Sequence, residues 1–371
     1  MLVVHIPSWF PRADSPLEGN FILKQIATTT PYTTAIILHH TDCPADNLKL
    51  PDNVIFCPVN YKRTSRTGLI RAYFKTFKTI IKQYGKPDIL HLHISLPLGI
   101  IAARLSRKYN IPLILSEHWS IYQPQNRGQI STLQRWQMNY IFKTVRHITT
   151  VSDNLHQAIT DTIPTAQRIS FTQVSNAINT KLFCPGEPTA YDRKQLLHIS
   201  TLENRAKNIT GILRTIKTLS EQRNDFELNI IHDLENPVVR QYIQQEHLED
   251  IVHLLGKKSE EEVAHAIQQC DFLVQVSNYE NQPCVLLEAF CCGKPVITTP
   301  VGGIPEIINE QNAMVVAPHD EKALLETLND MLDHFTTFSA DGISKEASDK
   351  YAAEIIGKKF LLTYRHVTGI K

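Results

Sequence analysis

The most constraining feature of the sequence is an alternation of short apolar runs with longer amphipathic segments. In the first half, this alternation predicts buried strands at residues 3–6, 34–38, 54–57, 89–92, 113–115 and 147–151. Apolar residues at helical spacing predict helices over residues 21–28, 69–84, 99–109, 133–142 and 154–160. Strands that alternate with helices are typical of a parallel sheet covered by helices on both faces.

The same pattern restarts after Pro185, Gly186 and Pro188, which interrupt the chain. It predicts a helix from Asn208, a helical stretch over 345–371, and strands at 196–199, 228–231, 251–254, 272–276, 296–298 and 314–316. A chain of 371 residues, 42% of them apolar, suits two domains of ordinary size. We therefore predict two doubly wound, Rossmann-like α/β domains, over residues 1–188 and 189–349. Ligands of such sheets bind beyond the carboxyl ends of the strands, so the domains are expected to face each other across a cleft.

Charge is divided unevenly between the two halves. Residues 1–185 hold 20 of the 38 basic residues but only 9 of the 37 acidic ones. Segment 61–86 contributes eight bases, Lys62 and Arg63 among them, and no acid. Two interpretations stay open: a helix with a solvated basic face, or a peripheral contact with an anionic membrane surface. Nucleic acid is not an expected partner, because no recognised binding motif accompanies the charge.

The expected location is the cytoplasm, with the inner membrane surface as a peripheral site. No stretch approaches the roughly 20 apolar residues that span a bilayer. The first residues lack the charged start of a signal peptide and read as a strand. The seven cysteines are an odd number that indicates no disulfide framework, and they lack the paired spacing of a metal site.

Two nucleotide-binding fingerprints and a metal motif are missing from the sequence. The 14 glycines form no Gly-x-Gly-x-x-Gly set, and no Gly-Lys-Ser or Gly-Lys-Thr occurs, which argues against dehydrogenases and P-loop enzymes. His91 and His93 share one strand face, but spacing reveals no third ligand and no His-Glu-x-x-His motif. We therefore expect neither a metal nor another cofactor.

Segment 277–306 carries the most informative chemistry. Pro283 is predicted at the first position of a helix that stops at Gly293. Glu288 is the only acid in this apolar helix and needs a partner, which a vicinal diol such as a ribose could provide. Glu280 precedes the helix, whose amino end offers amide donors to a phosphate. The alternative interpretation is that both glutamates have purely structural roles.

This segment resembles the donor-site motif of the family 4 glycosyltransferases, which are retaining enzymes of the GT-B fold. The motif has two glutamates separated by seven residues, then Glu-Ala, Gly-Lys-Pro-Val-Ile and Gly-Gly-x-Pro-Glu, here at 280, 288–289, 293–297 and 302–306. The resemblance implies that Glu280 holds hydroxyl groups of the transferred sugar and that Glu288 holds the ribose. It also implies a diphosphate seat at the helix start, which comprises Asn281, Gln282, Pro283 and Cys284.

The resemblance extends over nearly the whole chain. It implies that Gly19 faces the donor phosphate and the acceptor, that His118 bonds a hydroxyl of the sugar, and that Gly256 lies near the base. It further implies that a C-terminal helix, at about residues 350–371, packs back on the N-terminal domain.

Loop 202–208 resembles the loop that brings an arginine and a lysine to the donor diphosphate. Lys207 matches the lysine. Thr201 stands at the usual arginine position, which leaves Arg205 as the candidate substitute. Cations there would stabilise charge that grows on the leaving group.

The resemblance thus implies a retaining, metal-independent transfer of a sugar from a nucleotide-diphosphate sugar to a glycan or lipid-linked acceptor. Cell-surface polysaccharide or glycoconjugate synthesis is the expected setting. A nucleotide-sugar epimerase or phosphorylase on the same fold is the alternative within enzymes. The alternative that is not an enzyme is a two-lobed sugar-binding protein without catalysis.

Overall fold

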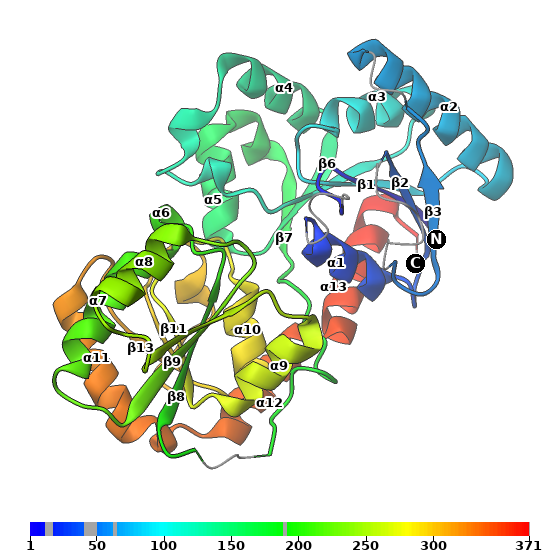
Figure 1. Ribbon diagram of the computed structural model, residues 1–371. Coiled ribbons are helices and arrows are strands. Elements are labelled where there is room, and N and C mark those ends of the chain that lie inside the picture. The colour runs from blue at the N-terminus through cyan, green and yellow to red at the C-terminus, as the bar shows by residue number, and fades with distance from the viewer. Residues whose placement is uncertain (12–17, 41–49, 62–64, 188–190, 371) are drawn as a thin grey trace. The chain divides into compact units, whose positions relative to one another are not determined.

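The computed structural model describes residues 1–11, 18–40, 50–61, 65–187 and 191–370 (Figure 1). Its contacts divide the chain into two compact units. The first unit comprises residues 1–177 and 353–371, and the second comprises residues 178–352.

The first unit is a parallel sheet between two helical layers. Its strands are β1 (Leu2–Pro7), β2 (Thr34–His39), β3 (Val54–Pro58), β4 (Ile89–His93), β5 (Leu113–Glu117), β6 (Val145–Thr150) and β7 (Ser170–Gln173). They pair in parallel in the order β3-β2-β1-β4-β5-β6-β7. Its helices are α1 (Asn20–Thr29), α2 (Arg66–Tyr84), α3 (Gly99–Tyr109), α4 (Thr132–Phe142), α5 (Asp153–Thr162) and α13 (Ala353–Thr368).

Apolar side chains alternate between the two faces of this sheet. Val4 packs in the core formed with α2, α3, α4 and α5, whereas Val3 packs beneath α13. Helix α1 covers the same face as α13, and Gly357 of α13 approaches it so closely that a Cβ would lie 2.2 Å from the carbonyl oxygen of Thr28. Both faces are therefore buried, which explains why the strands read as continuous apolar runs.

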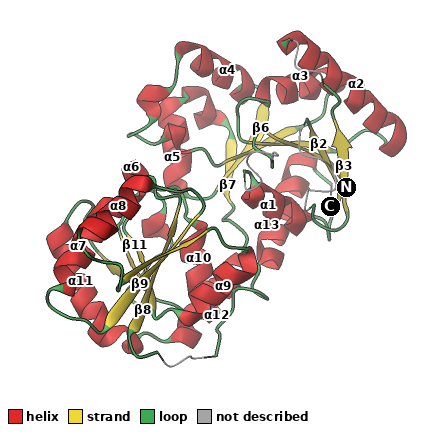
Figure 2. Cartoon of the chain, in the orientation of Figure 1, coloured by secondary structure: helices red, strands yellow, loops and turns green. Residues whose placement is uncertain are grey.

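The second unit repeats the plan with six parallel strands (Figure 2). They are β8 (Lys194–Ser200), β9 (Phe226–His232), β10 (Val252–Gly256), β11 (Phe272–Gln275), β12 (Val296–Thr298) and β13 (Ala313–Val315). Their order is β10-β9-β8-β11-β12-β13, so the chain reverses direction across the sheet between β8 and β11. The helices are α6 (Asn204–Lys207), α7 (Ile209–Ser220), α8 (Pro237–Gln245), α9 (Glu260–Gln269), α10 (Cys284–Cys291), α11 (Glu321–His334) and α12 (Ala340–Tyr351). Helices α7, α8 and α11 pack on one face, and α9, α10 and α12 on the other.

The structure differs from the sequence-based expectations in several places. Pro283 caps α10 with extended backbone (φ −71°, ψ 120°) instead of occupying its first turn. Helix α12 ends at Tyr351 and α13 begins at Ala353, because Ala352 is extended (ψ 141°) and bridges to Ile178. The contacts place the change of unit at residue 178, and residues 188–190, where the sequence predicts the boundary, lie outside the described residues. None of the described helices combines the length and apolar character needed to cross a membrane.

Candidate active site

The loop after β11 and the loop after β8 meet at the point where the second sheet reverses its strand order. Glu280 follows β11 and forms an ion pair with Lys207, which follows β8. The Glu280 carboxylate also accepts a hydrogen bond from the hydroxyl of Ser277 (3.0 Å). The side chains of Glu280 and Lys207 are only 12% and 20% exposed. Ligands of doubly wound sheets bind at such a reversal, so this pair marks the candidate site.

Hydrogen bonds to backbone carbonyls hold the two loops together. The amide nitrogen of Asn278 donates to the carbonyl of Ala206 (2.8 Å), and its side-chain nitrogen donates to the carbonyl of Arg205 (3.0 Å). Asn208, in the left-handed region at φ 51°, ends the single turn of α6 immediately after Lys207. The lysine is therefore carried on a short turn whose position is tied to the glutamate loop.

A third loop passes directly over Glu280. Gly302 follows β12 with φ +57°, and a Cβ there would lie 1.7 Å from the carbonyl oxygen of Glu280. The hydroxyl of Thr299 on the same loop donates to the carbonyl of Ser277. Only glycine fits this position, because both the backbone angle and the contact exclude a side chain.

A buried histidine beneath the lysine loop was not singled out by the sequence. Nδ1 of His198 donates to the carbonyl of Val274 (2.8 Å), and Nε2 accepts from the hydroxyl of Ser200 (2.8 Å). Ser200 in turn accepts from the amide of Leu202 (3.1 Å). Burial lowers the pKa of His198 to about 4, with a smaller contribution from the positive charge of Lys207. The histidine is thus neutral and fixes the start of the loop. Its place two residues before the strand end was the only sequence signal.

Helix α10 begins next to Glu280. Its N-cap residue, Pro283, makes no side-chain cap hydrogen bond, and the positive end of the helix dipole favours an anion here. Glu288 lies on its second turn at a half-buried position. Gly256 ends β10 in the left-handed region at φ +68°, and an added Cβ would meet nothing within 4 Å.

The first unit holds two of the predicted residues, Gly19 and His118. Gly19 has φ +74°, and a Cβ there would lie 2.5 Å from the carbonyl oxygen of Trp9. His118 follows β5, and its Nε2 lies 3.2 Å from the side-chain oxygen of Gln25. Burial lowers the pKa of His118 to about 3, so its imidazole is neutral and able to exchange hydrogen bonds with a hydroxyl group.

Two family models match the chain. The model described as "Glycosyltransferase Family 4" covers residues 32–182, and the model described as "Glycosyl transferases group 1" covers residues 185–337. The chain belongs to the group 1, family 4 glycosyltransferases. The predicted family membership is therefore confirmed.

Relatives and solved structures agree with this assignment. An uncharacterised glycosyltransferase of Methanocaldococcus jannaschii is 29% identical over 317 residues, which cover 81% of this chain and 82% of the relative. N-acetyl-alpha-D-glucosaminyl L-malate synthase of Bacillus anthracis is 28% identical over 240 residues, which cover 62% of this chain and 60% of the relative. The chain thus spans less than two thirds of that second protein.

Solved structures share the fold along the whole chain. Sucrose-phosphate synthase from Thermosynechococcus elongatus superposes with a TM-score of 0.80 at 17% identity, covering 100% of both chains. The Anabaena protein HepE, in complex with UDP, gives 0.77 at 16% identity and covers 99% of this chain and 100% of its own. These neighbours confirm the predicted GT-B fold of two Rossmann-like domains.

The loop after β8 has no arginine at the position usual for the family, as the sequence indicated. Thr201 is exposed, and the exposed Arg205 contributes its backbone carbonyl to the link with Asn278. The structure therefore brings Lys207 to Glu280 and leaves the role of the Arg205 side chain a prediction.

The structure also supplies a third histidine that spacing did not reveal. His5 on β1 is paired in register with His91 on β4, and together with His93 it forms a fully buried cluster. Both ring nitrogens of His91 are engaged, with the hydroxyls of Tyr364 (2.8 Å) and Ser116 (2.7 Å). Burial lowers the pKa of each of the three imidazoles. The cluster thus packs the interior as neutral rings.

A buried carboxylate of the first unit was also missed. Glu117 accepts hydrogen bonds from the amides of Ser95 (3.0 Å), His118 (3.0 Å) and Trp119 (3.1 Å), and from the hydroxyl of Tyr122 (3.2 Å). Burial raises its pKa, and these hydrogen bonds oppose the shift. The carboxylate fixes the turn that carries His118.

Proposed function

We propose that this glycosyltransferase moves a sugar, with retention of anomeric configuration, from a nucleotide-diphosphate sugar to a glycan or lipid-linked acceptor. The observation that carries the proposal is the Lys207–Glu280 pair beside the amino end of α10. A cation and a helix end suit a diphosphate, and a carboxylate with free acceptor capacity suits the hydroxyl groups of a sugar.

The neighbours and relatives support the donor class and the setting. HepE was solved in complex with UDP and with UDP-glucose. One relative is a putative teichuronic acid biosynthesis glycosyltransferase of Bacillus subtilis. We infer a nucleotide-sugar donor and a role in polysaccharide or glycoconjugate synthesis for this chain.

In the proposed mechanism, Lys207 stabilises the negative charge that grows on the departing diphosphate, and α10 adds its positive end. Glu280 orients the transferred sugar, and Glu288 accepts hydrogen bonds from the ribose. The proton of the acceptor passes to a donor phosphate oxygen on the same face, since no residue is assigned as a nucleophile. These positive groups would replace a divalent ion, so activity is expected to survive a chelator.

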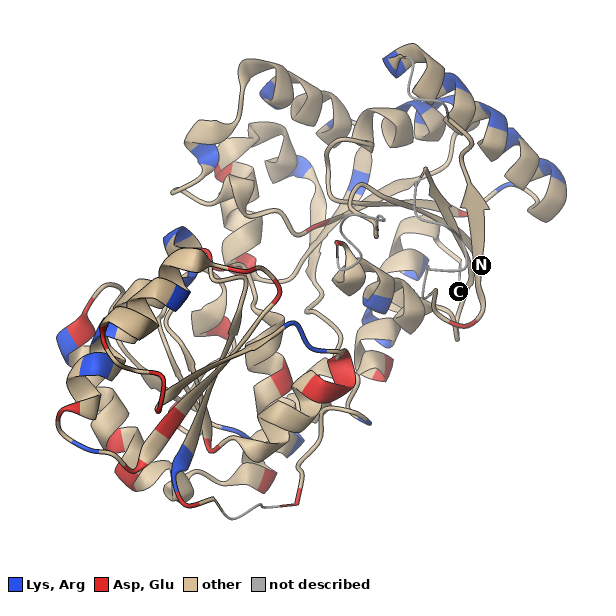
Figure 3. Ribbon diagram, viewed as in Figure 1, with Lys and Arg blue, Asp and Glu red and all other residues tan. Residues whose placement is uncertain are grey.

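The lipid-linked acceptor motivates a peripheral membrane contact by α2. Basic residues recur along α2 (Figure 3). Lys75, Lys78 and Lys82 are exposed, while Phe77 is buried in the core. The apolar face is occupied by packing, so the contact would be electrostatic and weakened by salt. Lys62 and Arg63, which extend the basic segment, lie outside the described residues. Binding to anionic vesicles at low salt tests the contact, and no binding there would contradict it.

Thermal stabilisation tests the donor site directly. A ligand that binds only the folded protein at 100 times its dissociation constant adds about 2.7 kcal/mol of stability. We expect UDP, GDP or ADP to raise the melting temperature of the wild type, and Lys207→Gln to abolish most of the rise. Equal stabilisation of both proteins would contradict the assigned phosphate contact.

A further inference from the structure

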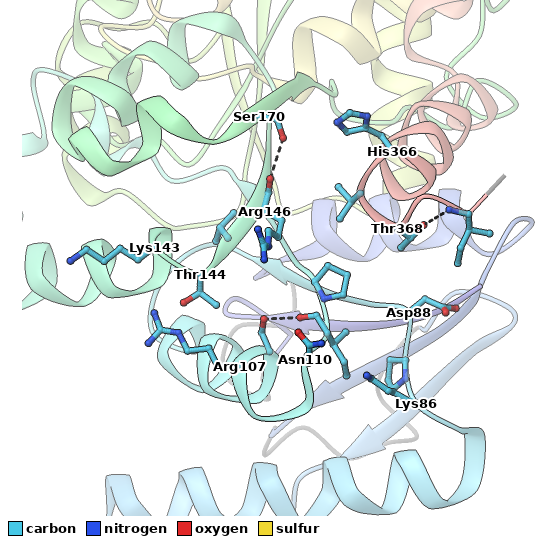
Figure 4. A pocket seen from close by; sticks show the side chains of 17 residues that line it. Lys86, Asp88, Arg107, Asn110, Lys143, Thr144, Arg146, Ser170, His366 and Thr368 are labelled. Carbon is cyan, nitrogen blue, oxygen red and sulfur yellow. Dashed lines mark hydrogen bonds between the residues drawn. The ribbon is translucent and has the colours of Figure 1, made fainter.

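A cavity of about 990 Å³ opens in the first unit, at the edge of the sheet where the strands begin (Figure 4). It is lined by residues that precede three strands: Asp88 before β4, Pro112 before β5 and Thr144 before β6. His118 follows the opposite, carboxyl end of β5. This space, the amino-edge cavity, is therefore distinct from the strand ends to which the catalytic roles are assigned.

The amino-edge cavity is strongly basic. Lys86, Arg107, Lys143 and Arg146 line it, against the single carboxylate of Asp88. No carboxylate of the described residues lies within ion-pair distance of these four cations. Asp88 is directed at the backbone, where its Oδ2 accepts from the amide of Leu2 (2.7 Å).

The negative ends of nearby helix dipoles neutralise only part of the positive charge of these cations. Helices α2, α3, α4 and α13 end beside the cavity, and each carboxyl end is equivalent to about −0.5 charge, or about −2 together. The four cations and Asp88 amount to a charge of +3. A net positive potential therefore remains after the helix dipoles are complemented.

Two of the cations are guanidinium groups from different elements. Arg146 lies on β6 and Arg107 on α3, and Figure 4 shows both beside the same space, with Asn110 and Lys86 at its lower side. The Arg107 guanidinium stacks on the ring of Tyr140, 4.4 Å from its centroid, which limits its freedom before any ligand binds. Guanidinium groups bind phosphate through two parallel hydrogen bonds.

We propose that the amino-edge cavity binds a ligand that carries two or more phosphate groups. Its volume suits a molecule of nucleotide or phosphosugar size. The cations lie on α3, on β6 and on the segment after α2. Their separate positions suit a ligand with several phosphate groups better than a ligand with a single phosphate. The proposal does not depend on the proposed function, because none of these residues belongs to the donor site.

Calorimetric titration with inorganic tripolyphosphate at low salt tests the proposal. The double variant Arg107→Gln, Arg146→Gln removes two cations from the cavity, and Lys75→Gln, Lys78→Gln removes two from the exposed face of α2. Lys207→Gln removes the donor-site cation. All five side chains are at least partly exposed, so the variants are expected to fold, and circular dichroism checks this.

The expected result is a loss of affinity of about tenfold or more in the cavity variant, with less than twofold change in the α2 variant. Binding at the cavity should persist in Lys207→Gln, which separates it from the donor site. Equal losses in the cavity and α2 variants, or no loss in either, would overturn the proposal.

Anionic phosphatidylglycerol vesicles distinguish the source of the phosphate. If vesicle binding falls in the cavity variant together with tripolyphosphate binding, the site takes lipid head groups. If tripolyphosphate binding falls while vesicle binding is retained, the site takes a soluble phosphorylated ligand.

Discussion

Replacing Gly302 with alanine tests whether close contact with the Glu280 loop matters for activity. A control glycine that has only backbone strain provides the comparison. The new Cβ would lie 1.7 Å from the carbonyl oxygen of Glu280, and real Cβ contacts are essentially never shorter than 3.0 Å. One loop must therefore move by about 1.3 Å or more, measured from these two distances. The positive φ adds about 1–2 kcal/mol of strain, and overpacking adds about 1–3 kcal/mol.

We expect Gly302→Ala to lower donor turnover by about 100-fold, because a shift of about 1 Å in a catalytic group has this effect. The matched control is Gly85→Ala, which has φ +90° but nothing within 4 Å of the added carbon. Because Gly85 also has ψ 177°, a conformation that glycine almost alone adopts, the control should lose about 1–3 kcal/mol of unfolding free energy and keep its turnover. Release of nucleoside diphosphate gives the rate, and circular dichroism establishes that each variant is folded. Turnover of Gly302→Ala within threefold of the wild type would show that the clash does not displace Glu280.

Three further predictions concern charge and protonation. Lys207→Gln and Glu280→Gln should each lower kcat by about 100- to 1000-fold in steady-state kinetics, whereas near-normal rates in both would remove the pair from the site. Glu288→Gln should raise KM for the donor at least as clearly as it lowers kcat, and an unchanged KM would argue against a ribose contact. Burial holds the pKa of His5 and His118 at about 3, whereas an unfolded histidine titrates near 6.5. Above pH 6.5 these histidines are neutral in both the folded and the unfolded protein. Between pH 6.5 and 3 they are protonated only in the unfolded protein. The free energy of unfolding therefore falls as the pH drops toward 3, by up to about 1.4 kcal/mol per pH unit for each histidine. Hydrogen exchange of β1 and β5 between pH 7 and 4 measures this, and equal protection across the range would contradict it.

The alternating pattern predicted most strands and helices because buried parallel strands are apolar on both faces. Strand β7 (Ser170–Gln173) was missed because it is a polar strand at the sheet edge, where one neighbour suffices. The break at Ala352 was missed because its cause is a bridge to Ile178, far away in sequence. Local periodicity contains no information on such a contact.

The sequence allows candidate site residues to be named but does not give their arrangement. The motif pointed to Glu280 and Lys207, which are 73 residues apart, and the structure joins them. The contact of Gly302 with the Glu280 carbonyl and the support from His198 depend on how three loops cross. Strand register, which no spacing rule gives, likewise decided that His5 joins His91.

Retaining transfer is tested most directly by following the anomeric proton of the released or transferred sugar by NMR, with UDP-, GDP- and ADP-sugars as donors. We predict that the wild type consumes at least one of them and that the first product has the anomeric configuration of the donor. Glu280→Gln should slow this reaction by about 100-fold without changing the anomer. A first product of inverted configuration, or equal rates in both proteins, would contradict retaining transfer at this site.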